Sequence, residues 1–273
     1  MHGQTFAISG CPRSGTTWLH NALIAAGRFK GIRGDDAAPA SRGLFVTDEN
    51  QYVHSLLLRI AGGGVTERRA AQGCLTLVHG MLRARFGGRE GLLLKSPYFS
   101  FFADLLFAEE FVQKVVYIKR DLISIALSML RHPFLKEQIN GNRSRFSSMI
   151  YKGTDFEVSH VPRDISRDFE ERYSELTSME RAFYKCLCFE TSMGTFRHMV
   201  PRDKTFIVDY GTLGTDGIVQ TNISEFLELT AGQRALVFKD FNASRRFARA
   251  EGACELTEFM KRVLVARDVA WRQ

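Results

Sequence analysis

Long apolar runs are missing from this sequence. A helix that crosses a membrane needs about 18 or more consecutive apolar residues, and no stretch of the chain approaches that length. The first apolar run starts at Thr5, so we expect no signal peptide ahead of it. We therefore expect a protein without a membrane span that resides in the cytoplasm.

Cysteine is scarce, and its spacing does not suggest a metal site. The five cysteines are an odd number and include no C-x-x-C pair. Cys186 and Cys188 are two residues apart, so they point to different faces of the helix expected there, whereas metal ligands must converge on one point. We expect reduced, mostly buried thiols, which fits a cytoplasmic location, and no bound metal.

The chain also lacks a basic stretch interleaved with aromatic residues, so nucleic acid is not an expected partner. Its net charge is nevertheless +7, which favours an anionic ligand. With 273 residues, of which 45% are hydrophobic and 25% charged, the chain can fold around a sizeable core.

The N-terminal segment has the pattern of a strand, a glycine-containing turn and a helix. Gly10 and Gly15 have the spacing of a Walker A motif, G-x-x-x-x-G-K-[ST], but Thr16 occupies the lysine position and the cation of the turn is Arg13. The backbone N–H groups of such a loop, with the helix N-terminus that follows, bind anions. Without the lysine, the loop is poorly suited to ATP or GTP phosphoryl transfer. It suits a nucleotide with a single 5′-side anionic group.

Short apolar runs alternate with helical patterns, which predicts a three-layer α/β fold with helices on both faces of a parallel sheet. The expected strands lie near residues 5–10, 91–95, 114–119 and 205–210, and the expected helices cover about 14–26, 122–131, 165–199, 217–229 and 256–267. We assign residues 1–273 to a single domain. Residues 132–163 have no clean periodicity and are interpreted as a lid or acceptor-binding insertion, with a surface loop carrying short helices as the alternative.

Cations follow the expected strands at one edge of the sheet. Ligands of open parallel sheets bind beyond the carboxyl ends of the strands. Arg13 follows the first expected strand, Lys95 ends the second and Arg120 follows the third. Three cations at one edge suit a ligand with several negative charges.

The run Pro12–Leu19 resembles the 5′-phosphosulfate loop of sulfotransferases that use 3′-phosphoadenosine 5′-phosphosulfate (PAPS). The resemblance implies a P-loop NTPase-like sulfotransferase architecture. It implies that Arg13 contacts the transferring sulfonate and the bridging oxygen, and that Trp18 stacks on the adenine. The 5′-phosphate would be held by Ser14, Gly15, Thr16 and Thr17.

Further segments extend this resemblance. Arg120 and Ser128 are similar to a pair that clasps the 3′-phosphate in the family, although Leu122 stands where relatives have proline. Lys95 is similar to a lysine that stabilises the sulfonyl oxygens during transfer. The segment 206–213 is similar to the Tyr-Glu-Asp-Leu strand end of the family, with Gly211 and Thr212 in place of the two acids.

The resemblance leaves the general base open. Relatives with a Lys-Thr-His segment carry a catalytic histidine where this chain has Pro97. Tyrosylprotein-type relatives place a glutamate shortly after the loop helix, in a region that here contains Asp35 and Asp36. We expect Asp36 to be the base and Asp35 to be the second candidate, with His132 and His160 as the remaining ones.

The motifs predict an enzyme that moves a sulfonate group from PAPS to a hydroxyl acceptor and releases adenosine 3′,5′-bisphosphate. Its expected catalytic residues are Arg13, Lys95 and Asp36, and no metal takes part. The acceptor stays open among small molecules, glycans, lipids and natural products, and so does assembly into a homo-oligomer. The alternatives are a P-loop kinase of a small metabolite and a non-catalytic nucleotide-binding relative.

Overall fold

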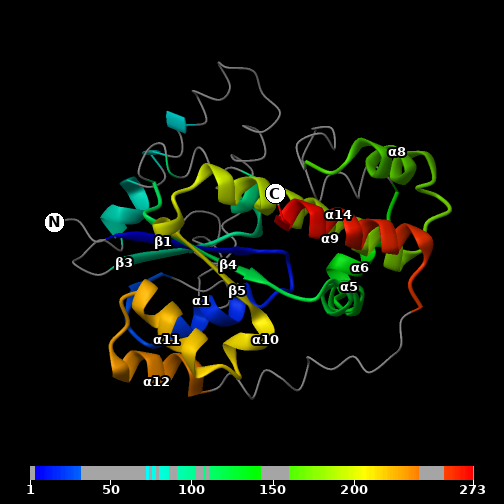
Figure 1. Ribbon diagram of the computed structural model, residues 1–273. Coiled ribbons are helices and arrows are strands. Elements are labelled where there is room, and N and C mark those ends of the chain that lie inside the picture. The colour runs from blue at the N-terminus through cyan, green and yellow to red at the C-terminus, as the bar shows by residue number, and fades with distance from the viewer. Residues whose placement is uncertain are drawn as a thin grey trace.

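A parallel sheet forms the centre of the molecule (Figure 1). The computed structural model describes residues 4–31, 72–73, 76–77, 80–85, 91–101, 107, 111–142, 160–239 and 255–272. Within them the strand order is β2-β3-β1-β4-β5, and every strand pair is parallel. The strands are β1 (Thr5–Gly10), β2 (Phe29–Lys30), β3 (Gly91–Lys95), β4 (Lys114–Lys119) and β5 (Thr205–Asp209).

The predicted α/β class with a parallel sheet is confirmed. All residues of β1 and β3 are buried, as parallel strands covered by helices on both faces require. The edge strand β2 is not among the predicted strands, because its two residues are too few to show a periodicity.

Helices cover both faces of the sheet (Figure 1). On one face lie α1 (Thr16–Ala25), α10 (Tyr210–Leu213), α11 (Gly217–Phe226) and α12 (Ala231–Lys239). The other face carries α9 (Ser178–Met199) and α14 (Glu258–Arg272), while α5 (Leu122–Arg131) and α6 (Pro133–Asn140) follow the end of β4. The remaining described elements are α8 (Arg163–Glu171) and the 3-10 helices η2 (Pro97–Phe101) and η4 (Arg202–Lys204).

Two apolar cores hold these layers together. One packs α1, α11 and α12 against side chains of the sheet such as Phe6 and Ile8. The second packs α5, α9 and α14 against each other and includes Cys11 of the phosphate loop. Cys11, Cys186 and Cys188 are buried, as expected, and none of the three forms a disulfide. The other two cysteines lie outside the described residues.

The prediction of a single long helix over residues 165–199 is wrong. The chain forms α8 and α9 there, separated by residues 172–177. A capping box begins α9: the Thr177 hydroxyl accepts a hydrogen bond from the Glu180 N–H, and the Glu180 carboxylate accepts one from the Thr177 N–H at 2.8 Å. The Thr-x-x-Glu pattern is the sequence signal for this helix start, and a continuous periodicity conceals it.

The segment 132–163 contains at least one regular element, because α6 occupies its first part. Residues 143–159 lie outside the described part of the chain. Within the part that is described, no helix combines the length and apolar character that crossing a bilayer requires. Nor do three or more His, Cys, Asp or Glu side chains of the described residues converge where they could hold a metal ion.

Candidate functional site

The loop between β1 and α1 is tightly packed at both of its glycines. A methyl group at Gly10, whose φ is 154°, would lie 2.6 Å from the carbonyl oxygen of Ile118, its partner in β4. A methyl group at Gly15, whose φ is 107°, would lie 2.3 Å from a ring carbon of Tyr210. Neither site accepts a side chain, which explains why the loop has glycine at these two positions.

The interior of this loop holds a buried hydroxyl without a partner. Ser14 is fully buried, and its Oγ makes no hydrogen bond to any described residue. Gly15 caps α1 without a side-chain hydrogen bond, and the first turn of α1 has no acidic residue. An unpaired buried donor beside a helix N-terminus is the arrangement expected of an anion-binding site.

Arg13 connects the loop to α5. It adopts a left-handed backbone conformation with φ 74°, which is uncommon for a residue other than glycine. Its exposed side chain donates a hydrogen bond from Nε to Oγ of Ser128 at 3.1 Å. In turn, Nη1 of Arg120 donates to the carbonyl oxygen of Arg13 at 3.0 Å. The structure thus brings Arg13, predicted to contact the transferring sulfonate, together with Arg120 and Ser128, which are predicted to contact the 3′-phosphate.

The sheet topology explains why these residues meet. The chain leaves β1 toward β2 on one side of the sheet and leaves β4 toward β5 on the other side. Such a change of direction between adjacent strands is where ligands of open α/β sheets bind. Arg13 follows β1 and Arg120 follows β4, so the two guanidinium groups flank this point.

Arg120 is a half-buried cation with neutral partners. Its Cζ lies 5.0 Å from the ring centroid of Tyr210. Burial lowers the pKa of Arg120, whereas Tyr210 and the carboxylate of Asp121 act in the opposite direction and the positive charge of Arg13 contributes least. A guanidinium stays protonated throughout. Within the described residues neither of these arginines forms an ion pair, so the site carries positive charge that an anion would neutralise.

Lys95 lies on the opposite side of the loop from Arg120. It ends β3, which pairs with β1, and its side chain is almost fully buried. Its Nζ donates to Oγ1 of Thr17 in the first turn of α1, at 2.7 Å. The predicted cation of the second strand therefore contacts the same loop-and-helix unit as Arg13.

Trp18, the predicted adenine contact, is half-buried and packs against Phe238 of α12, with ring centroids 6.3 Å apart.

The candidates for the general base differ in what the structure describes of them. Asp36 and Asp35 lie outside the described residues. His132 follows α5 one turn after Ser128, and its Nδ1 is buried without a hydrogen bond to a described residue. His160 has a positive φ of 56°, and burial lowers its pKa.

A buried polar cluster supports the carboxyl end of β4 and was not predicted from the sequence. Tyr117 Oη donates to Oε1 of Glu190 at 3.2 Å, and Trp271 Nε1 donates to Oε2 of the same carboxylate at 2.9 Å. Burial raises the pKa of Glu190, while the charge of Lys119 acts in the opposite direction. The Nζ of Lys119 lies 3.8 Å from the ring centroid of Trp271, so this cluster joins α14 and α9 to the strand that precedes Arg120.

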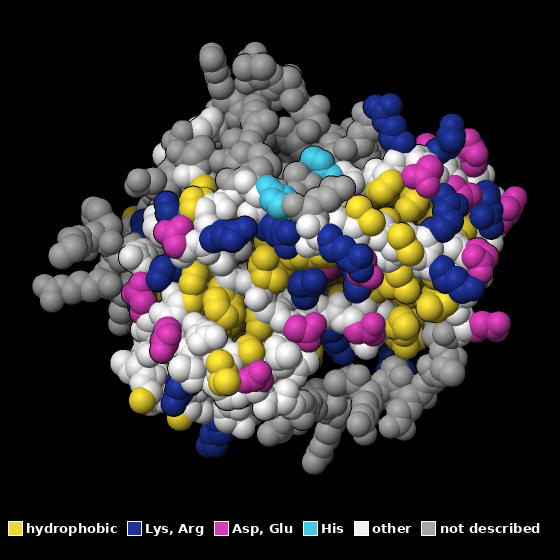
Figure 2. Space-filling view, viewed as in Figure 1, with side chains coloured by type: hydrophobic (Ala, Val, Ile, Leu, Met, Phe, Trp, Pro, Cys, Tyr) yellow, Lys and Arg dark blue, Asp and Glu magenta, His cyan; other side chains and the backbone are white. Residues whose placement is uncertain are grey.

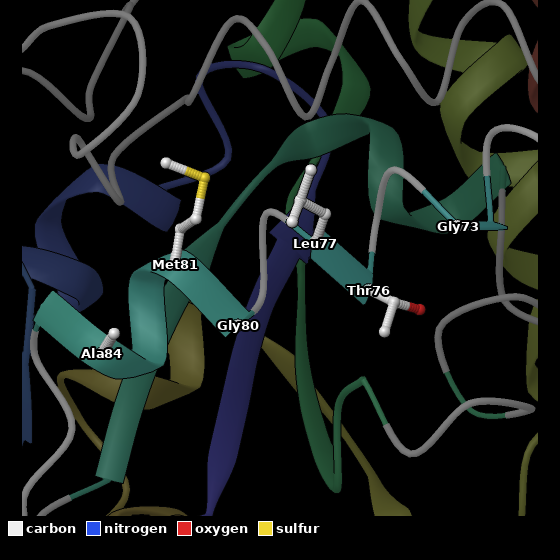
Figure 3. Close-up of a pocket in the computed structure, with 6 residues that line it drawn as sticks. All are labelled: Gly73, Thr76, Leu77, Gly80, Met81 and Ala84. Carbon is white, nitrogen blue, oxygen red and sulfur yellow. The ribbon is translucent and has the colours of Figure 1, made fainter.

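The surface around these elements is basic, whereas a separate hollow is apolar. A band of Lys and Arg side chains crosses the middle of the face shown in Figure 2, between α14 above and α11 below. A hollow of about 540 Å³ lies along the helical residues 72–73, 76–77 and 80–85 (Figure 3). Its lining residues are Gly73, Thr76, Leu77, Gly80, Met81 and Ala84, so none of the predicted site residues contributes to it.

Comparisons with known proteins give a structural likeness. No family model and no curated protein matches the sequence. A sulfotransferase domain from the curacin biosynthetic pathway superimposes with a TM-score of 0.51 at 13% identity, over 96% of each chain. A sulfotransferase domain of the Synechococcus PCC 7002 olefin synthase (TM-score 0.48, 13% identity, 98% of this chain and 94% of that one) and the sulfotransferase STF9 from Mycobacterium avium (TM-score 0.49, 12% identity, 99% and 75%) are also similar. The likeness to the curacin-pathway domain, together with the parallel sheet, shows that this chain has a sulfotransferase-like fold.

Proposed function

We propose that the chain is a sulfotransferase that takes its sulfonate group from PAPS. The observation that carries the proposal is the contact between Arg13 and Ser128, because it joins a 5′-side anion loop to a second cationic site at a ligand-binding edge of the sheet. A nucleotide with anionic groups at both its 5′ and 3′ positions fits such a two-ended site. A nucleoside triphosphate has its charges on one side only.

The buried hydroxyl of the loop supports the same ligand. The Ser14 hydroxyl is buried without a partner among the described residues, so a 5′-phosphate oxygen would satisfy it. Arg120 and Ser128 would hold the 3′-phosphate, and the loop N–H groups together with Thr16 and Thr17 would hold the 5′-phosphate.

Arg13 and Lys95 are the proposed electrostatic catalysts. As the acceptor oxygen forms its bond to sulfur, the bond between sulfur and the bridging phosphate oxygen breaks, and negative charge accumulates on the bridging and sulfonyl oxygens. Cations fixed where this charge develops stabilise the transition state. Positioning of the acceptor in line with the leaving group supplies the rest, and neither a covalent intermediate nor a metal is needed.

The acceptor proton must pass to a base as the new bond forms. We propose Asp36 for this role, with Asp35, His132 and His160 as the other candidates.

We assign residues 132–163 to an acceptor-binding insertion within a single domain. The acceptor is a hydroxyl compound among small molecules, glycans, lipids and natural products. The biosynthetic pathway named for the curacin domain makes natural-product alcohols the first class to screen. Nucleic acid is not a proposed partner, the proposed location is the cytoplasm, and assembly into a homo-oligomer is left to measurement.

An acceptor screen tests the proposal. The full chain is incubated with PAPS and a panel of alcohols, and products are analysed for the mass of one added sulfonate group. Sulfated product that requires both PAPS and intact Arg13 supports the proposal. Phosphorylated product with ATP–Mg²⁺ would assign the chain to the kinases, and ligand binding without any transfer would assign it to the non-catalytic relatives.

A further inference from the structure

Tyr210 occupies a position between the two halves of the proposed site. It is the first residue of α10, directly after β5, and only 9% of its surface is exposed. The carboxylate of Asp209 accepts a hydrogen bond from the Gly211 N–H at 2.7 Å, which fixes the start of α10 and with it the place of the tyrosine. The ring is therefore held by the end of β5 rather than by a free loop.

The ring contacts both anion sites at once. Its Cε2 and Cδ2 atoms would lie 2.3 and 2.4 Å from a methyl group at Gly15, so the ring lies against the backbone of the phosphate loop. The guanidinium of Arg120 lies over the same ring, with 5.0 Å from Cζ to the centroid. Arg120 also donates a hydrogen bond to the carbonyl oxygen of Arg13 in the loop. The loop, the Tyr210 ring and Arg120 therefore each contact the other two.

We infer that Tyr210 is a positioning residue that couples the loop to the second anion site by holding Arg120 in its binding orientation. This inference rests on the proposed function. A long arginine side chain has many rotamers, and restricting it before the ligand arrives lowers the cost of binding. An aromatic face does this while also attracting the cation. The contact with Arg120 is made by the ring, so phenylalanine keeps this contact and leucine removes it.

The test compares binding of adenosine 3′,5′-bisphosphate and adenosine 5′-monophosphate by calorimetry, using the full chain. The pair differs only in the 3′-phosphate. For Tyr210→Leu we expect the bisphosphate dissociation constant to rise about tenfold and the monophosphate constant to change about twofold or less. For Tyr210→Phe we expect both constants to stay within about twofold of wild type. A matched control is Leu213→Ala, which removes a fully buried side chain from the same short helix and should reduce stability without changing the ratio of the two constants.

A double-mutant cycle with Arg120→Ala supplies a readout that a purely structural role would not move. The variant Tyr210→Leu/Arg120→Ala should bind the bisphosphate no more weakly than Arg120→Ala alone, whereas Leu213→Ala and Arg120→Ala should be additive. Additive losses for Tyr210→Leu and Arg120→Ala, or equal losses for the phenylalanine and leucine variants, would overturn the inference while leaving the proposed function standing. Failure of wild-type protein to bind the bisphosphate would overturn both.

Discussion

The guanidinium of Arg13 donates a hydrogen bond to the hydroxyl of Ser128 at 3.1 Å, across 115 residues of chain. One residue belongs to the loop after β1 and the other to the helix after β4, so the contact exists only because these strands are neighbours in the sheet. It joins the cation of the loop, predicted to contact the sulfonate, to a residue predicted to contact the 3′-phosphate. The predictions below follow from this arrangement.

Arg13→Ala should reduce turnover by about 10²–10³, the loss typical for removal of one electrostatic contact to a transition state. The side chain is exposed, so the melting temperature should stay close to that of wild type. Steady-state rates with an identified acceptor measure the effect. Arg167→Ala, at an exposed arginine of α8 that lies outside the proposed insertion, is the matched control and should retain full activity. Turnover of Arg13→Ala close to wild type would remove Arg13 from the catalytic residues.

Lys95→Met should also reduce turnover by about 10²–10³, because methionine keeps the apolar stem and removes the cation that contacts Thr17. Lys30→Met, at an exposed lysine of the edge strand β2, is the control that should leave the rate unchanged. Equal rates for the two variants would contradict a catalytic role for Lys95.

Ser14→Ala should act in opposite directions on stability and on binding. Removal of a buried hydroxyl without a partner should raise the free energy of unfolding of the unliganded protein by about 1 kcal/mol. The same change should weaken adenosine 3′,5′-bisphosphate binding about fivefold to tenfold, because the phosphate loses a hydrogen bond. Urea unfolding and calorimetry measure the two quantities. A loss of stability together with unchanged binding would show that the hydroxyl has another role.

Glu190 and Glu228 should make the free energy of unfolding depend on pH in opposite directions. Burial raises the pKa of Glu190 above its ordinary value, so the folded protein keeps the Glu190 proton at pH values where the unfolded chain has already lost it. The contribution of Glu190 to the free energy of unfolding therefore declines as pH rises. Hydrogen bonding to Lys114 lowers the pKa of Glu228, with further contributions from Arg28, so its contribution is lost as pH falls. The unfolding free energy of Glu190→Gln relative to wild type should increase from pH 4 to pH 8, and that of Glu228→Gln should decrease. Slopes of the same sign would contradict this assignment.

The sequence predicts the loop and the strand-end cations because both depend on local patterns. Glycine spacing identifies the turn from Gly10 to Gly15, and buried apolar runs identify β3 and β4 together with the polar residues that follow them. Since parallel strands end at one edge, the meeting of Arg13 with Arg120 follows from strand assignment alone.

The parts that were not predicted depend on contacts between distant segments. Nothing in the sequence near Tyr210 shows that its ring lies against Gly15, because this contact depends on how β5 is placed beside β4. The burial of Glu190 next to Tyr117 likewise depends on the packing of α9 on the sheet. The two helices in place of one over 165–199 illustrate a local signal, the capping box at Thr177, that a strong apolar periodicity conceals.

Ligand-dependent stability tests the central claim most directly. The melting temperature of the full chain is measured with adenosine 3′,5′-bisphosphate and with ATP–Mg²⁺ at equal concentrations. A ligand that binds only the folded state stabilises it in proportion to its affinity. The two-ended site predicts an increase with the bisphosphate, little change with ATP–Mg²⁺, and loss of the increase in Arg120→Ala. Stabilisation by ATP–Mg²⁺ but not by the bisphosphate would contradict the assignment as a PAPS-dependent sulfotransferase.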